Sequence, residues 1–312
     1  MLDVFSAALS AMMTMFVCMF VGFFLQKKRL EPEDTDSVLS KLLNYAICPA
    51  LTFTTFSQNF SIASLSENYR LILICAVLMF SAMLLSLPLS RLFAKEGYTR
   101  NVYKYALTFA NSGYMGDAIV LALFGTEMLY YYKLYTFPLT IGIYSWGMAQ
   151  LVPGKRGFKG TLLRCLNPST VAMLLGMAAG LLNLYIPDFM NSALINLGNC
   201  LGPIAMVLTG YVVGKCDLKK MLTNTGVYFA SLLRLIVLPG IFCGALVLLG
   251  VDKLTVTLAL VALGMPLGLN TVVFPAAYGK DTSVGAGMSL ISTVLSVVTF
   301  PLMYMIFSSF FG

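Results

Sequence analysis

Long apolar stretches, separated by short polar connections, follow one another along the whole chain. A helix needs about 20 consecutive apolar residues to cross the roughly 30 Å hydrocarbon core of a bilayer. Ten stretches of the sequence approach this length. They span residues 3–26, 38–58, 69–93, 101–124, 129–151, 167–186, 191–214, 226–250, 254–278 and 283–310. The pattern predicts an all-α integral membrane protein with ten transmembrane helices.

Two of these stretches are interrupted by polar and helix-breaking residues at matching places in the two halves of the chain. The fourth contains Ala110-Asn-Ser-Gly-Tyr-Met-Gly116, and the ninth contains Gly264-Met-Pro-Leu-Gly-Leu-Asn270. Non-helical backbone is tolerated at membrane depth only where it faces protein or a water-filled cavity. Two broken segments at corresponding positions are typical of a transporter's binding site.

Composition also places the chain in a membrane. Hydrophobic residues make up 59% of the 312 positions and charged residues 11%, with a mean hydropathy of +0.86, which excludes a soluble domain. The first stretch begins with Asp3 and precedes Lys27-Lys-Arg29 without a cleavage site, so we expect a retained helix and not a signal peptide. The seven cysteines form no CxxC pair and histidine is absent, so we expect neither a metal site nor a cofactor.

The net charge of +7 follows membrane orientation and does not indicate nucleic-acid binding. Sixteen of the 20 basic residues flank the odd-numbered connections, whereas Arg70, Lys133 and Lys253 flank the even-numbered ones. The remaining one, Arg234, lies inside the eighth stretch. Basic residues accumulate on the cytoplasmic side of membrane proteins. We therefore expect a multi-pass protein of the cell inner (cytoplasmic) membrane with both termini outside.

The two halves of the chain carry similar landmarks in the same order. Residues 152–166 form a long polar cytoplasmic connection that divides the chain into residues 1–151 and 167–312, each with five predicted helices. Because five is odd, a second copy of the unit enters the membrane from the opposite face, as in inverted-repeat transporters. Chance is the alternative, since proline and glycine are common in membrane helices. The matching pairs are Pro49 and Pro203, Pro88 and Pro239, Gly113 and Gly268, and Pro138 and Pro301.

Six short motifs are spread over nearly the whole chain. They are Leu43-Asn-Tyr-Ala-Ile-Cys-Pro-Ala-Leu51, Phe109-Ala-Asn-Ser-Gly-Tyr-Met-Gly116, Asn167-Pro168, Pro203-Ile-Ala-Met206 with Gly210, Leu233-Arg-Leu235 with Pro239, and Tyr278-Gly-Lys-Asp281. Together they resemble the auxin efflux carrier family. The resemblance implies the bile acid sodium symporter-like fold of the bile/arsenite/riboflavin transporter superfamily, with crossed broken helices 4 and 9. Helices 1, 2, 6 and 7 would form a scaffold domain, and helices 3–5 and 8–10 a transport domain.

The two breaks supply candidate substrate-binding residues. Each break frees backbone N–H groups at the start of the outgoing half-helix, where the helix dipole favours an anion. Polar side chains add neutral donors and acceptors, and glycines allow the backbones to approach closely. The alternative is that these side chains only satisfy freed backbone groups. The candidates are Asn44, Asn111, Ser112, Gly113, Tyr114, Gly116, Pro266, Gly268, Asn270 and Thr271.

Asp117 is the candidate ion-coupling residue. Auxin efflux carriers commonly have an apolar residue here, and a carboxylate at bilayer depth is unfavourable unless it is solvated, paired or protonated. One interpretation is a helix N-cap, because Asp117 begins the outgoing half-helix. The other is a carboxylate that couples proton or sodium movement to transport. A fixed negative charge at this position also opposes an anionic substrate.

Two further features concern helix packing. We expect the Arg234 guanidinium to bond backbone carbonyls or to reach the membrane interface, in preference to contacting substrate. Small residues at four-residue spacing, Gly176 with Gly180 and Gly210 with Gly214, allow helices to pack closely within the chain or between chains.

We therefore expect a secondary-active transporter, a permease or efflux carrier, of small organic anions such as dicarboxylates or auxin-like carboxylic acids, with elevator-type alternating access. Neither a phosphate-binding loop nor a catalytic motif is present, so we do not expect an enzyme. The alternatives are a sodium- or proton-coupled symporter of a different small organic solute, and a passive channel. The expected partners are the organic anion and the lipid bilayer, and the family resemblance permits a homodimer.

Overall fold

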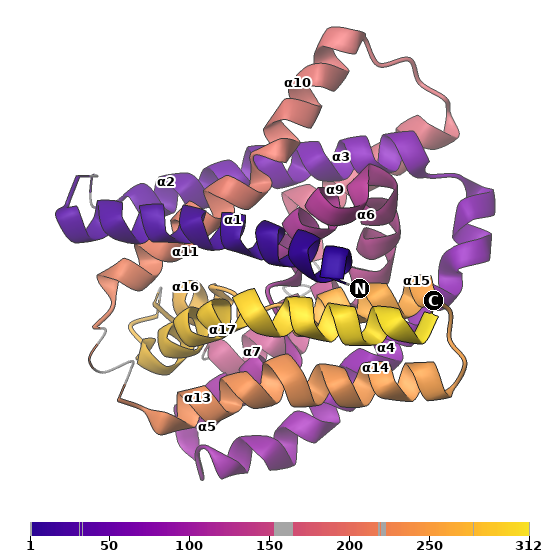
Figure 1. Cartoon of the computed structure of the whole chain (residues 1–312). Helices are drawn as coiled ribbons and strands as arrows, with labels where there is room; N and C mark the ends of the chain where they lie inside the picture. Colours follow the sequence, from indigo (N-terminus) through magenta and orange to yellow (C-terminus); the bar gives the residue numbers. More distant parts are fainter. Residues whose placement is uncertain are drawn as a thin grey trace.

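Helices form all the regular structure in the part of the chain that can be described. This computed structural model describes residues 2–30, 32, 34–152, 165–217, 219, 223–276 and 278–311 (Figure 1). The predicted connection 152–166 falls mostly outside these residues, together with Lys155, Arg156, Lys159 and Arg164. For the described residues the all-α prediction is confirmed.

The helices follow one another with short connections. In chain order they are α1 (Leu2–Lys28), α2 (Thr35–Leu42), η1 (Leu43–Ile47), α3 (Cys48–Asn59), α4 (Ile62–Leu89), η2 (Ser90–Leu92), α5 (Gly97–Thr108), η3 (Ser112–Gly116), α6 (Asp117–Gly142), η4 (Ile143–Gly147), α7 (Met148–Leu151), α9 (Pro168–Leu181), α10 (Asp188–Asn199), α11 (Leu201–Lys215), α13 (Thr225–Leu232), η5 (Leu233–Val237), α14 (Leu238–Leu248), α15 (Lys253–Gly264), α16 (Asn270–Ala276), α17 (Ser283–Ser308) and η6 (Ser309–Phe311). The elements η1, η3, η4 and η5 are π-helical, and η2 and η6 are 3-10 helices.

Among the described residues, six helical segments are long and apolar enough to cross a membrane. They are Asp3–Lys28, Ile62–Leu92, Gly97–Leu151, Asp188–Lys215, Thr225–Leu248 and Ser283–Phe311. One of them, Gly97–Leu151, has 55 residues, which at 1.5 Å per residue is about 80 Å and far exceeds one crossing. Two other apolar helices, α9 and α15, have only 14 and 12 residues. The predicted count of ten therefore stays a prediction.

The chain reverses inside α6 at Gly125. This glycine has a φ of +81°, in the region that L side chains rarely adopt, and it interrupts the helical geometry. Residues 117 and 133 lie eight positions on either side of it. A straight helix would separate them by about 24 Å, whereas their side chains are in contact. The predicted turn between residues 124 and 129 is therefore confirmed.

Helix pairs from opposite halves of the chain form the main packing contacts. The helix α1 packs along α11, and α3 packs against α9 and α10. A second group of contacts joins α4 with α6, α13 with α17, α5 with α4, and α15 with α14. In Figure 1, α1, α2, α3 and α11 lie together in the upper part of the view, and α13, α14 and α17 lie below them.

Small residues bring these helices together. The face of Gly210 lies against the Met19 carbonyl of α1, and that of Gly176 lies against the Phe53 carbonyl of α3. Gly214 faces the Gln26 side chain, and Gly180 faces the end of α3. Close helix packing through these two spacings is therefore confirmed, and it occurs within the chain.

Candidate functional site

The two predicted breaks contact each other. The first lies between the end of α5 at Thr108 and the start of η3 at Ser112, and the second lies between α15 and α16, from residue 265 to 269. The Asn111 backbone N–H donates to the Pro266 carbonyl at 2.8 Å. Gly268 lies against the Asn111 side chain, where an added Cβ would be 3.3 Å away. Both irregular backbones are therefore covered by protein, as their position demands.

A polar cavity of about 200 Å³ opens beside the contact between the breaks. It is lined from the first break, from η1 and α3, from the second arm of α6, from the start of α9, and from the second break. The structure brings seven of the ten candidate substrate-binding residues to its wall. They are Asn44, Asn111, Ser112, Gly113, Tyr114, Gly268 and Asn270.

Three candidates face elsewhere. Gly116 lies against Tyr132, whose hydroxyl would be 2.2 Å from an added Cβ. Thr271 is fully buried, and its side chain packs against Gly285. Pro266 contributes its carbonyl to the bond between the breaks and does not line the cavity. These three residues maintain the shape of the breaks without reaching the cavity.

Asp117 pairs with Lys133 across the cavity wall. The Lys133 Nζ donates to Asp117 Oδ2 at 2.7 Å, and the two side chains are 14% and 8% exposed. Two expectations are corrected here. Lys133 does not mark a surface connection, because the reversal at Gly125 returns it to the depth of Asp117. Asp117 is not an N-cap, because η3 runs directly into α6 and the carboxylate makes no capping bond.

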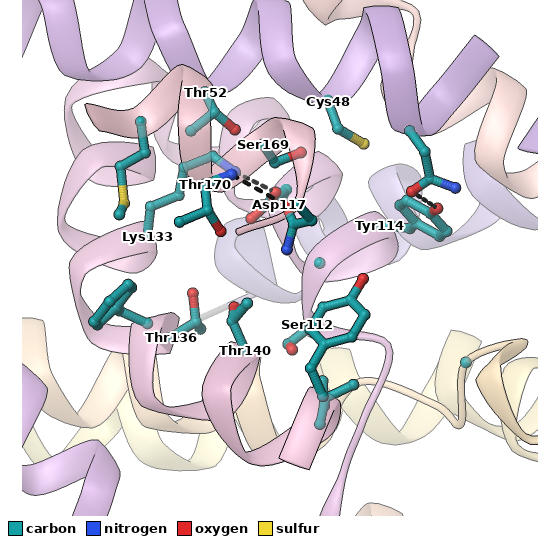
Figure 2. A pocket seen from close by; sticks show the side chains of 18 of the residues that line it. Cys48, Thr52, Ser112, Tyr114, Asp117, Lys133, Thr136, Thr140, Ser169 and Thr170 are labelled. Carbon is teal, nitrogen blue, oxygen red and sulfur yellow. Dashed lines mark hydrogen bonds and ion pairs between the residues drawn. The ribbon is translucent and has the colours of Figure 1, made fainter. Parts of the chain in front are cut away.

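Several polar residues of the cavity wall were not predicted. Thr52 of α3, Thr136 and Thr140 of α6, and Ser169 and Thr170 of α9 point into the same space as the ion pair (Figure 2). The spacing of Lys133, Thr136 and Thr140 places them on one helix face, which is a signal that the sequence contained. The Thr52 hydroxyl is buried and, within the described chain, has no hydrogen-bond partner.

Hydrogen bonds tie the cavity wall to its supporting helices. The Tyr114 hydroxyl donates to Asn44 Oδ1 at 2.9 Å, and the Asn44 amide donates to the Ser40 carbonyl at 2.9 Å. Asn270 Nδ2 donates to the Tyr105 hydroxyl at 2.9 Å. These amides line the cavity and also bond neighbouring protein groups.

Arg234 lies away from the cavity. It is 2% exposed, and its Nη1 donates to the Ala106 carbonyl in the last turn of α5 at 2.8 Å. A cation at a helix C-terminus is favoured by the helix dipole. The expected bond to a backbone carbonyl is therefore confirmed, and Arg234 does not line the cavity.

A strongly apolar all-helical chain with a polar cavity at two broken helices has the features of a membrane transporter. The family model described as "Membrane transport protein" matches residues 7–159 and 157–304, and the chain belongs to this family.

Two curated relatives align over nearly the whole chain. An "Uncharacterized transporter" of Methanothermobacter thermautotrophicus is 23% identical over 305 residues, covering 96% of this chain and 98% of its own length. "Uncharacterized transporter MJ1031" of Methanocaldococcus jannaschii is 24% identical over 300 residues, covering 92% and 94% respectively. Both names agree with a role in transport.

Proposed function

We propose that this membrane transport protein is a secondary-active carrier of small organic anions, such as dicarboxylates or auxin-like carboxylic acids. The observation that supports this proposal most strongly is the contact between the two broken segments beside a polar cavity. A cavity of about 200 Å³ is large enough for a small organic acid. We also propose that the protein lies in the bilayer of the cytoplasmic membrane with both termini outside.

The electrostatics of the cavity wall favour an anion. The wall includes Ser169 and Thr170 in the first turn of α9, where the helix dipole places partial positive charge. It also includes the Lys133 ammonium, which offsets the charge of Asp117. The pairing reduces the conflict between the negative residue and an anionic substrate, because Asp117 is no longer an uncompensated charge. Asn111 and Asn270 supply neutral donors for a carboxylate.

Reciprocal helix packing supports the inverted-repeat part of the proposal. If helices 1–5 correspond to helices 6–10, the contact of α1 with α11 corresponds to that of α3 with α9. Likewise, the contact of α4 with α6 corresponds to that of α13 with α17. The repeat and the two-domain division account for this correspondence without further assumptions.

The position of the cavity supports an elevator mechanism. Asn44, Cys48 and Thr52 come from proposed scaffold helix 2, and Ser169 comes from scaffold helix 6. The opposite wall comes from residues 110–117 and 133–144 of the proposed transport domain. A cavity between two domains changes its access when one slides against the other.

A binding screen followed by one matched pair of variants tests the proposal. Purified protein is screened by thermal shift against dicarboxylates and monocarboxylates, and the best stabiliser is used in a counterflow assay in liposomes. Asn111→Ala should weaken binding roughly ten-fold to over a hundred-fold, because a hydrogen bond to a charged group contributes about 1.5 to 3 kcal/mol.

Asn68→Ala is the matched control, since among the described residues the Asn68 amide bonds the Ser64 carbonyl of its own helix and lies outside the cavity. Counterflow that is lost in Asn111→Ala and kept in Asn68→Ala supports the proposal. Absence of stabilisation by any carboxylate, or equal affinity in both variants, would place the transported solute in another class or the site elsewhere.

A further inference from the structure

We propose that Lys133 binds the carboxylate of a monocarboxylate substrate and that Asp117 takes up one proton in the same step. This inference rests on the proposed function and narrows its substrate class. In the empty site the Lys133 ammonium is paired with Asp117. On loading, a hydronium ion of the solvent gives its proton to a carboxylate oxygen of Asp117 and becomes water. The ion pair of Asp117 with Lys133 breaks, and the substrate carboxylate takes the place of Asp117 beside the ammonium.

The geometry makes this exchange direct. Lys133 and Asp117 both line the cavity, with their contact at its wall (Figure 2). An ammonium has three N–H donors. Among the described residues, Lys133 makes one hydrogen bond, to Asp117 Oδ2. A small anion in the cavity therefore reaches the ammonium without any change in the backbone.

Thr52 gives an independent indication of a ligand at this place. Thr52 is 4% exposed and belongs to the cavity wall, and its buried hydroxyl has no hydrogen-bond partner among the described residues. A buried hydroxyl without a hydrogen-bond partner is unfavourable, because it has lost its bonds to water. In Figure 2 Thr52 lies with Ser169 and Thr170 around the ion pair. A carboxylate oxygen held by Lys133 would give the Thr52 hydroxyl an acceptor.

Charge balance sets the number of protons. Among the described residues, Lys133 and Asp117 are the charged side chains that line the cavity. The surrounding elements also carry thiol and phenol groups, Cys48, Tyr114, Tyr132 and Tyr144. These groups are neutral at neutral pH, because thiols and phenols ionise only at higher pH. The empty cavity is therefore neutral as a whole.

A bound monocarboxylate alone would leave one unbalanced negative charge. An unbalanced charge is strongly unfavourable in a low-dielectric site. One proton on the Asp117 carboxyl restores neutrality. A dicarboxylate would still leave one negative charge, so the site favours monocarboxylates.

Proton counting tests the proposal. Binding of L-lactate and indole-3-acetate to the full-length protein is measured in weakly buffered solution with a pH-sensitive dye, and malonate serves as the dicarboxylate probe. The wild type should take up about one proton per bound monocarboxylate. The affinity of the wild type for a monocarboxylate should then fall roughly ten-fold for each unit of increase in pH, over the range in which Asp117 is ionised in the unbound protein. Asp117→Asn should bind without proton uptake and without this pH dependence.

The role of Lys133 is isolated in a background that folds. Lys133→Met alone leaves Asp117 buried without its partner, so the informative comparison is Asp117→Asn with and without Lys133→Met. Loss of the ammonium should weaken monocarboxylate binding at least ten-fold. The matched control is the ion pair of Lys215 with Asp36, 2.8 Å apart and outside the cavity, in which Lys215→Met and Asp36→Asn should change neither affinity nor proton uptake.

The outcomes separate this inference from the proposed function. Carboxylate binding that depends on Asn111 but keeps its proton uptake in Asp117→Asn overturns the role of Asp117 and leaves the site intact. Equal affinity with and without Lys133 overturns the role of Lys133. Tighter binding of malonate than of either monocarboxylate overturns the charge argument. If none of the three probes binds the wild type, the narrowed substrate class is wrong; if the wider carboxylate screen also fails, the proposed function falls as well.

Discussion

Gly210 makes the closest approach to another helix among the described glycines, and its replacement with alanine should disrupt that contact. A Cβ at this position would lie 1.8 Å from the Met19 carbonyl oxygen of α1, where ordinary contact begins at 3.4 Å. The helices α1 and α11 must therefore move apart locally by about 1.6 Å, because the opposing atom is backbone and has no alternative rotamer. Overpacking of this kind typically costs 1 to 3 kcal/mol. We expect Gly210→Ala to reach the upper part of that range.

Gly214, one turn further along α11, is the matched control. An added Cβ there would lie 3.1 Å from both the Cβ and the Oε1 of Gln26, so a shift of only a few tenths of an ångström is needed. Gly244→Ala controls for helix propensity, since nothing lies within 4 Å of its added Cβ. Thermal unfolding of the three purified variants in one detergent should show a large loss of stability only in Gly210→Ala. Equal stability of Gly210→Ala and Gly214→Ala would refute the packing of α1 on α11.

Two smaller changes probe the cavity wall. In a variant that keeps Cys48 and has serine at the other cysteines, a small thiol reagent should modify Cys48, and a bound carboxylate should slow the reaction several-fold. In the control variant that keeps only the exposed Cys200, the rate should be the same with and without the carboxylate. Asn167→Ala removes the side chain that accepts from the Thr170 N–H at 3.0 Å and caps α9, so it should lower stability by about 1 kcal/mol in chemical unfolding, whereas Asn167→Asp should retain the cap. These assignments would be contradicted if no bound carboxylate changed the rate of Cys48 modification, or if Asn167→Ala were as stable as the wild type.

The breaks were predictable because they are local in sequence. Gly113, Gly116 and Gly268 weaken a helix wherever they stand together with asparagine or proline, whatever surrounds them. Their contact with each other was expected from the family resemblance, which implies crossed broken helices 4 and 9. Which of the flanking side chains reach the cavity was less predictable, because Thr271 and Asn270 are neighbours and face different surroundings.

The ion pair was missed because it depends on the path of the chain. Lys133 follows a predicted turn by a few residues, a position at which a lysine ordinarily extends to the membrane surface. Only the reversal at Gly125 brings it beside Asp117. The N-cap interpretation of Asp117 failed for a related reason. Its N–H already bonds the Ser112 and Tyr114 carbonyls of η3, so the helix begins before it.

The position of the ion pair relative to the two proposed domains connects its charge to movement. Asp117 and Lys133 lie on helices 4 and 5 of the proposed transport domain, so they would move together, whereas Thr52 and Ser169 would remain with the scaffold. A site that crosses the low-dielectric part of the membrane with a net charge meets a barrier of several kcal/mol. The pair is neutral when empty, and the proposed loading of one anion with one proton keeps it neutral. The proposed transport domain could then cross the membrane both with and without substrate. A site with a single unpaired lysine would carry a net charge when empty and would not allow this.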